Sequence, residues 1–159
     1  MTGETPTLRK AARVLLLDED RRVLLVRFRY RGKRWWTAPG GGLEDEETHE
    51  DAARREIAEE TGFELVELGP WVWTREHVFR FEGRLYRQHE RYFVASVPAF
   101  DPRPKLLGAE EARVLDGLRW WTLTELVATP EEFAPADLPA LLGRLVEQGP
   151  PEHPLKVGA

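Results

Sequence analysis

The sequence contains no cysteine among its 159 residues. Disulfides, thiolate metal sites and cysteine nucleophiles are therefore excluded, and any bound metal must be held by oxygen ligands or by histidine. The chain also lacks a long apolar run, because Arg13 and Asp18 bracket the apolar residues 14–17. A membrane-spanning helix needs roughly 20 consecutive apolar residues, so we expect no membrane span.

The first ten residues lack the apolar stretch of a secretory signal peptide, so we expect a cytoplasmic protein. Its length and its 42% hydrophobic and 32% charged content predict one globular domain over residues 1–159, with loose ends at 1–9 and 150–159. The chain also has no excess of positive charge. Its net charge of −5 argues against a stable nucleic-acid partner, because such domains usually carry a basic face.

Charge is nevertheless distributed unevenly along the chain. Residues 27–34 are basic and residues 44–51 are acidic, which suits a site where phosphates and cations meet. Two solvated surfaces would produce the same pattern, so both readings stay open. The basic side chains that would contact phosphates are Arg27, Arg29, Lys33 and Arg34.

Alternating apolar and β-favouring residues predict strands, and helical spacing predicts two helices. The expected strands span residues 12–17, 23–28, 63–68, 71–81, 85–97 and 118–123, and the expected helices span 48–61 and 138–147. Three consecutive glycines at 40–42 predict a turn where the backbone approaches another group closely. This mixture predicts an α/β sandwich around one sheet.

The helix at 48–61 gathers acidic side chains on one stripe. A rotation of about 100° per residue places Glu56, Glu59 and Glu60 within about 100° of arc. Like charges so placed repel by a few tenths of a kcal/mol per pair in water, and a divalent cation would reverse the sign. An exposed acidic helix offset by Arg54 and Arg55 is the alternative, and the adjacent glycines favour the metal site.

The stretch from Gly41 to Phe63 resembles the Nudix box at every fixed position. The matching residues are Gly41, Glu47, Arg55, Glu56, Ile57, Glu59, Glu60, Gly62 and Phe63. The likeness extends over roughly residues 10–147, through the Trp-x-x-Pro-Gly-Gly segment at 36–41 and the segment at 119–126. The resemblance implies the Nudix fold, an α/β/α sandwich with a mixed central β-sheet in the α/β (α+β) class.

The resemblance also implies the activity. Nudix hydrolases cleave a phosphoanhydride bond of a nucleoside di- or triphosphate derivative by metal-assisted attack of water on phosphorus. The implied cofactor is Mg²⁺, with Mn²⁺ as a substitute. By position, Glu56, Glu59, Glu60 and the carbonyl of Gly40 correspond to the metal ligands, and Arg55 corresponds to the arginine that orients a neighbouring glutamate.

The general base stays open at this point. Water must lose a proton as it attacks, so a carboxylate is needed within hydrogen-bond reach. In the family this base comes from the box or from a later loop. We name Glu56 first and Glu111 as the loop alternative, with Glu90, on an expected strand, as the weaker one.

The substrate is less well indicated than the reaction. A nucleobase would stack on one of several aromatic side chains near the box: Trp35, Trp36, Trp71, Trp73, Phe79 and Phe81. The markers of the ADP-ribose, dinucleoside polyphosphate and coenzyme A subclasses are missing. Two other functions stay open, a non-catalytic Nudix-fold nucleotide sensor and an RNA-cap-processing enzyme. Many relatives form dimers, so a homodimer is possible.

Overall fold

The computed structural model describes residues 3–105 and 107–158. Within them the chain forms eight strands and four helices. They are β1 (Thr7–Leu17), β2 (Val23–Tyr30), β3 (Lys33–Thr37), β4 (Gly40–Gly42), α1 (His49–Thr61), β5 (Trp71–Phe81), β6 (Arg84–Ser96), α2 (Ala109–Val114), β7 (Leu115–Trp121), α3 (Leu123–Ala128), α4 (Leu138–Gln148) and β8 (Leu155–Lys156). No helix in this part of the chain is both long and apolar enough to cross a membrane.

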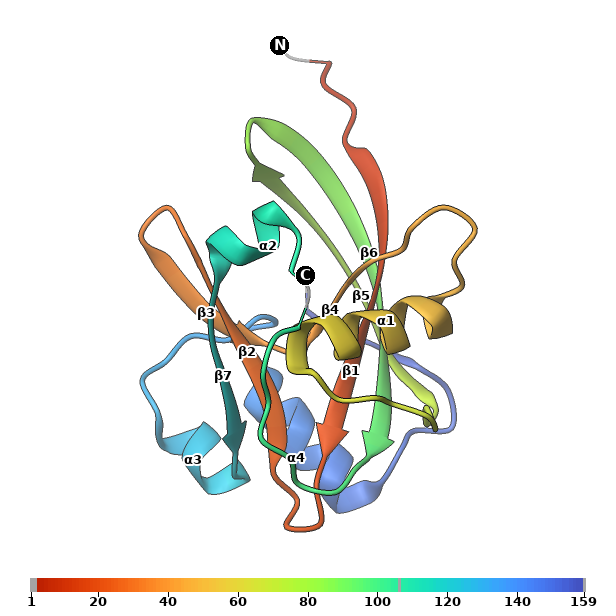
Figure 1. Ribbon diagram of the computed structural model, residues 1–159, viewed down its shortest axis with the longest axis vertical. Helices are drawn as coiled ribbons and strands as arrows, with labels where there is room; N and C mark the ends of the chain where they lie inside the picture. The colour runs from red at the N-terminus through yellow and green to blue at the C-terminus, as the bar shows by residue number, and fades with distance from the viewer. Residues whose placement is uncertain (1–2, 106, 159) are drawn as a thin grey trace.

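The strands form one mixed sheet in the order β3-β2-β1-β6-β5-β8, with β4 paired to β1 and β7 paired to β2. The central pair β1 and β6 is parallel, whereas β2 and β5 are antiparallel to their inner neighbours. The mixed sheet predicted from the family resemblance is therefore confirmed, and Figure 1 shows its strong curl.

The hairpin between β1 and β2 follows from the polar residues that join them. The Asp18 carboxylate accepts hydrogen bonds from the backbone N–H groups of Asp20 and Arg22, at 3.0 and 2.8 Å. It also accepts one from Nε of Arg22 at 2.7 Å. An aspartate that accepts hydrogen bonds from the backbone N–H groups of the residues that follow it stabilises a tight turn, so the predicted hairpin is confirmed.

Apolar side chains fill both faces of the sheet. Along β1, Leu15 faces the core that packs against α4, whereas Val14 and Leu16 face the core that packs against α1. A strand buried on both sides reads as a continuous apolar run, as residues 14–17 do. Helix α1 covers one face and α4 the other (Figure 1), which confirms the α/β/α sandwich.

The sheet opens at one end because β1 changes its neighbour. Near the hairpin Leu17 pairs with Val23 of β2, but at residues 11–13 the place beside β1 is taken by β4. The β2–β3 arm therefore diverges from β1, β6 and β5, and α2 lies above the gap (Figure 1). This opening is where the functional site forms.

The three glycines form strand β4, not the expected turn. The expected close approach is present: a Cβ on Gly40 would lie 2.1 Å from the carbonyl oxygen of Ala12, and its φ is 151°. Only glycine tolerates that contact and that φ, so β4 can lie tight against β1.

Several expectations at the edges of elements are wrong. Residues 63–68 form no strand. They connect α1 to β5, and Leu65 among them is buried in the core that packs against α1. Residues 7–9 were expected to be loose but belong to β1, where Leu8 pairs with Arg87. The expected loose end at 150–159 contains β8, which pairs with β5, and Val157, which is buried. Helices α2 and α3 were not predicted.

Candidate active site

Helix α1 begins and ends where its sequence predicts. The Thr48 hydroxyl accepts from the Asp51 N–H at 3.0 Å and the Asp51 carboxylate accepts from the Thr48 N–H, which forms a capping box. At the other end Gly62 adopts a left-handed conformation with φ 78°. These caps hold the acidic stripe of α1 in a fixed rotation beside β4.

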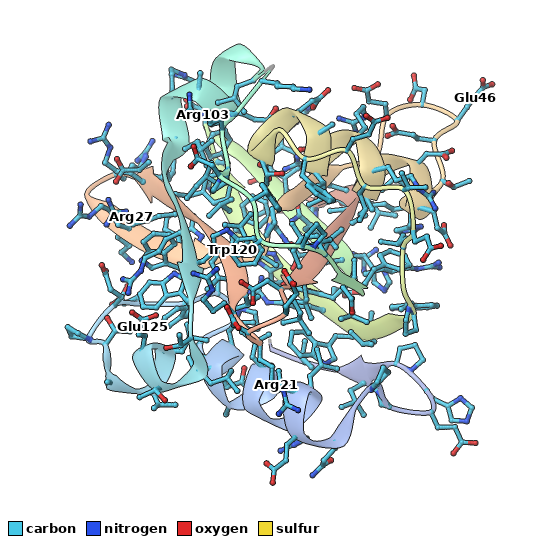
Figure 2. The ribbon with its side chains drawn as sticks, turned by 60° about the horizontal axis from the view of Figure 1, so that its bottom comes forward. Arg21, Arg27, Glu46, Arg103, Trp120 and Glu125 are labelled. Carbon is cyan, nitrogen blue, oxygen red and sulfur yellow. The ribbon has the colours of Figure 1, made fainter. Side chains whose placement is uncertain are left out.

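The loop after β6 ties the end of α1 to the next helix. The N–H groups of Arg103 and Lys105 donate to the carbonyls of Thr61 and Glu59, both at 2.8 Å. These bonds satisfy carbonyls that the end of a helix leaves free. Figure 2 labels Arg103 at this junction, next to α2. The loop thus places α2, and with it Glu111, beside the acidic face of α1.

Three carboxylates come together at this junction. Glu56, Glu59 and Glu111 each offer an oxygen, and these oxygens lie within 4.8 Å of one another. Oε2 of Glu56 is buried and has no hydrogen-bond partner in the described part of the chain. Gly41 faces the same group, and a Cβ there would lie 2.7 Å from the Glu56 carboxyl carbon. The glycine therefore leaves the Glu56 carboxylate open towards the cleft.

Glu60 lies deeper than these three residues. It is only 1% exposed, and its Oε1 accepts from the N–H of Gly40 at 2.9 Å. The ligand set expected from the sequence contains Glu60 and the carbonyl of Gly40, whereas the three clustered carboxylates include Glu111 instead. We call Glu56, Glu59, Glu60 and Glu111 the acidic wall.

The acidic wall concentrates negative charge where water is scarce. Burial, and then the charge of Glu111, raise the pKa of Glu56 to about 7. Burial, and then the charge of Glu56, raise the pKa of Glu60 well above its usual value. Glu56 and Glu60 are therefore unfavourable as two neighbouring anions, and a bound cation would be favourable beside them.

Arg55 links the loop before α1 to the acidic wall. It donates to Glu47 at 2.7 and 2.9 Å, to the carbonyl of Gly42 at 2.9 Å and to Glu56 at 2.8 Å. A further bond reaches Glu59 at 3.2 Å. The guanidinium fixes these groups in one planar arrangement, which fits the orienting position that the box assigns to it.

The acidic wall borders a cleft of about 1160 Å³ between the β2–β3 arm of the sheet and the arm formed by β1, β6 and β5. Among the aromatic and basic residues predicted to meet substrate, Trp35, Phe79, Phe81 and Lys33 line it. The tryptophans Trp36 and Trp73 instead belong to the core around α4, and Trp71 packs on the α1 side.

The other predicted basic residues do not line the cleft. Arg27 pairs with Asp116 at 3.3 Å, and Arg34 lies 3.8 Å from the same carboxylate. Arg29 is exposed. Most of the charge in the basic segment therefore stabilises the β2–β3–β7 arm or faces solvent. Figure 2 shows Arg27 on that arm.

Arginines elsewhere form the floor of the cleft, and sequence reasoning missed them. Arg9 and Arg13 lie on β1 and Arg75 lies on β5, and all three line the cleft. The available signal was their spacing, because residues four apart in a strand share a face, but Arg9 lay outside the strand expected at 12–17. Which strands pair could not be read from that spacing. We call Arg9, Arg13, Arg75 and Glu90 the basic floor.

Glu90 is the centre of this floor, on β6 between β1 and β5. It is fully buried and accepts hydrogen bonds from Nε of Arg13, from Arg75 at 3.2 Å, from Gln88 at 2.8 Å and from the Tyr92 hydroxyl at 3.1 Å. Burial alone would raise its pKa, but the charge of Arg13 and the hydrogen bonds outweigh burial and hold the pKa well below its usual value.

The residues of the acidic wall fit a hard divalent cation. The wall offers carboxylate oxygens, one of them buried without a partner, beside a glycine that leaves space. Mg²⁺ and Mn²⁺ prefer such oxygen ligands, and their charge would offset the burial and the repulsion that raise the pKa of Glu56.

Comparisons with known proteins agree with this fold. The NUDIX domain family model matches residues 7–142. An RNA pyrophosphohydrolase of Caulobacter vibrioides is 32% identical over 144 residues, covering 82% of this chain and 79% of that protein.

Two solved structures share the fold. A MutT Nudix hydrolase from Burkholderia pseudomallei aligns over 86% of this chain and 98% of its own, with a TM-score of 0.64 and 23% identity. The Nudix domain of Shewanella oneidensis NrtR, solved with ADP ribose, aligns over 91% of this chain and 89% of its own, with a TM-score of 0.64 and 18% identity. From the extent of the family match and the identity to its relative, the chain belongs to the Nudix family.

Proposed function

We propose that this chain is a Nudix pyrophosphohydrolase that uses Mg²⁺, with Mn²⁺ as a substitute, to cleave a phosphoanhydride bond of a nucleoside di- or triphosphate derivative. The observation that carries the proposal is the cluster of Glu56, Glu59 and Glu111 at the mouth of a large cleft. Carboxylates placed this close repel one another unless a cation lies between them.

Glu56 and Glu59 would hold the metal, with Glu111 facing them from α2 and Glu60 and Gly40 directly behind. When bound, the metal would neutralise charge on the phosphates and lower the pKa of a coordinated water. Arg55 would keep Glu56 and Glu59 pointing into the cleft, since it hydrogen-bonds to both.

The attacking water must give up a proton to a carboxylate near the scissile bond. Glu56 and Glu111 are the two groups we propose, and burial together with the nearby charge of Glu111 raises the pKa of Glu56 to about 7. A base with a pKa near neutrality accepts a proton and still releases it at physiological pH. Glu90 is unsuited to this step because its oxygens are occupied by donors on the floor.

The substrate is a nucleotide whose base reaches the outer, aromatic part of the cleft. Phe79 on β5 lies beside His77, with ring centroids 5.0 Å apart, and beside its cross-strand partner Tyr86, at 5.5 Å. Trp35 and Phe81 line the same cleft from the two arms. A base that stacks on such a surface gains about 1–3 kcal/mol of binding free energy, largely independent of its identity.

RNA is a second class of substrate, favoured by one specific observation. The Caulobacter vibrioides relative is named as an RNA pyrophosphohydrolase. RNA carries a phosphoanhydride only where its 5′ end is polyphosphorylated, so that end is the group this chain would accept. The cleft is open and carries basic residues on both arms, Lys33 on β3 and Arg80 on β5.

A substrate panel tests the proposal. We expect release of monophosphate or pyrophosphate from at least one of nucleoside triphosphates, nucleotide sugars, ADP-ribose, dinucleoside polyphosphates or 5′-polyphosphorylated RNA, with Mg²⁺ or Mn²⁺ and not with EDTA. Tight binding of one compound without turnover under any metal would instead support a nucleotide sensor. The variant that tests the acidic wall is Glu60→Gln, which we expect to fold and to turn over orders of magnitude more slowly.

A further inference from the structure

The basic floor carries more positive charge than its own carboxylate neutralises. Arg13 and Arg75 are 13% and 11% exposed, and both contact the single carboxylate of Glu90. Arginine stays protonated in proteins, so the carboxylate of Glu90 faces two largely buried cations, of which Arg13 also feels the charge of Glu60. A buried charge without a counter-charge is costly, which indicates that an anion from outside completes the floor.

Arg75 is the cation with donors to spare. Arg13 is held at two places, by Glu90 and by the carbonyl of Ala38 at 2.8 Å. Arg75 makes one hydrogen bond to Glu90, at 3.2 Å, and its Nε, which lies against Gly158, has no partner within residues 3–105 and 107–158. A guanidinium has five N–H donors, so Arg75 can hold Glu90 and a phosphate together.

Gln88 supplies an independent indication that a ligand lies here. It is 3% exposed and lines the cleft, and its Nε2 donates to Glu90 at 2.8 Å. That bond fixes the orientation of the amide, because a carboxylate only accepts. Oε1 is left buried without a partner in the described part of the chain. It needs a donor such as a ribose hydroxyl, so the missing ligand carries donors as well as negative charge.

Strand pairing places Arg75 across the cleft from the acidic wall. Gly42 pairs with Ala11, Ala11 with Glu90, and Glu90 with Arg75. Adjacent strands are about 4.8 Å apart, so the backbones of Gly42 and Arg75 are about 14 Å apart. Ala11, in the same row, has too small a side chain to fill the space between them. The extended guanidinium and a chain of phosphates can together span this gap.

We propose that Arg75, held in place by Glu90, binds a phosphate group of the substrate that lies beyond the phosphates at the acidic wall. Glu90 is then a positioning residue, which acts on the substrate through Arg75 and Arg13. The site makes the chain selective for substrates with an extra charged phosphate, such as a nucleoside triphosphate or a 5′-triphosphate end, over nucleotide sugars. This proposal rests on the proposed function for the identity of its ligand.

Binding of inorganic triphosphate in EDTA tests the floor without metal and without turnover. Calorimetry would compare the wild-type chain with Arg75→Gln, Arg75→Lys and Arg87→Gln. Arg87 is the matched control, because it lies on β6 next to Gln88 but is exposed and does not line the cleft. We expect Arg75→Gln to raise Kd about 10- to 100-fold, the worth of one or two hydrogen bonds to a charged group. Arg75→Lys should restore part of the loss, and Arg87→Gln should match the wild type.

Steady-state kinetics give the second readout. With the best nucleoside triphosphate of the panel, Arg75→Gln should raise KM by a similar factor and change kcat much less. With a nucleotide sugar its KM should stay near the wild-type value. A merely structural role would instead lower kcat for both substrates, together with the melting temperature.

The outcomes separate the two proposals. If Arg75→Gln binds triphosphate as tightly as Arg87→Gln does, or if the wild-type chain does not bind it in EDTA, the phosphate site is wrong whatever the turnover. If triphosphate binding depends on Arg75 but no compound of the panel is hydrolysed, the site stands and the proposed hydrolase activity fails.

Discussion

The acidic wall and the basic floor are two buried charged clusters in one cleft, and they differ in how their charges are satisfied. On the floor, Glu90 receives hydrogen bonds from four side chains, and its pKa falls. On the wall, Glu56 has Arg55 on one oxygen and no partner on the other, and its pKa rises to about 7. A carboxylate that structures the protein is saturated, whereas one that serves a ligand is left incomplete.

The largest expected effect comes from removing the charge at the centre of the wall. We expect Glu56→Gln to lower kcat about 10²- to 10⁴-fold, the range for loss of a group that takes part in proton transfer. The side chain keeps its size, so the melting temperature in EDTA should stay the same or rise. Glu50→Gln, on the exposed first turn of α1, is the control. A Glu56→Gln enzyme as fast as the control would show that the wall is not catalytic.

Removing the central carboxylate of the basic floor should lower the free energy of unfolding more than it lowers the rate of the reaction. Glu90→Ala would leave Arg13 and Arg75 buried without a counter-charge, at a cost of about 3–5 kcal/mol in the free energy of unfolding. Urea denaturation measures this loss. An exposed pair provides the control: Glu4→Ala breaks the bond to Arg80 at 2.8 Å and should cost far less, because water screens that pair. Equal losses would mean that Glu90 is not the anchor we describe.

The two clusters should also oppose each other in their dependence on pH. The folded-state pKa values of Glu56 and Glu60 are both raised, so their contribution to stability is present below the unfolded pKa, about 4.3. The contribution of Glu56 is lost as pH rises through its folded-state pKa of about 7. The pKa of Glu90 is lowered, so its contribution is present above about 4.3 and is lost as pH falls further.

Denaturation in EDTA at several pH values measures this opposition. Between pH 5 and 8 we expect the unfolding free energy to fall, by an amount on the order of a few kcal/mol. Mn²⁺ should remove the fall, and Glu56→Gln should flatten it. A wild-type chain whose stability rises over this range in EDTA would contradict the assignment of the wall.

The smallest expected effect concerns the space beside the wall. The methyl group of Gly41→Ala would lie 2.7 Å from the carboxyl carbon of Glu56, so the carboxylate must move. We expect kcat to fall about tenfold, since a small displacement of a catalytic group is enough for such a loss. Gly143→Ala in α4, which meets nothing within 4 Å, should leave kcat unchanged and gain about 0.5–1 kcal/mol of stability. If Gly41→Ala left the activity unchanged, the present position of the Glu56 carboxylate would not be required for turnover.

The sequence predicted the parts of the site that lie on one local element. The caps and the acidic stripe follow from spacing along α1, because a helix of known bounds fixes which side chains share a face. The orienting position of Arg55 was implied by the resemblance to the Nudix box. The hairpin at Asp18 was equally local. The Nudix box is also one local segment, so it was recognised before any contact was known.

The parts that depend on long-range pairing were not predictable. The floor joins residues 13, 75 and 90, which meet only because β1 is parallel to β6 and β5 is antiparallel to it. Glu90 was considered only as a base, since its partners lie elsewhere in the sequence. Glu111 joins the wall because Arg103 and Lys105 fold against the end of α1. Of the basic stretch at 27–34, Lys33 lines the cleft, whereas Arg27 and Arg34 lie beside Asp116, far along the chain.

Anomalous scattering from a crystal soaked in Mn²⁺ tests the central claim most directly, because it locates the ion without assuming a substrate. We predict a peak within bonding distance of Glu56 and Glu59, on the side that faces Glu111. A fully occupied Mn²⁺ bound elsewhere, with the three carboxylates apart and no density between them, would contradict the account.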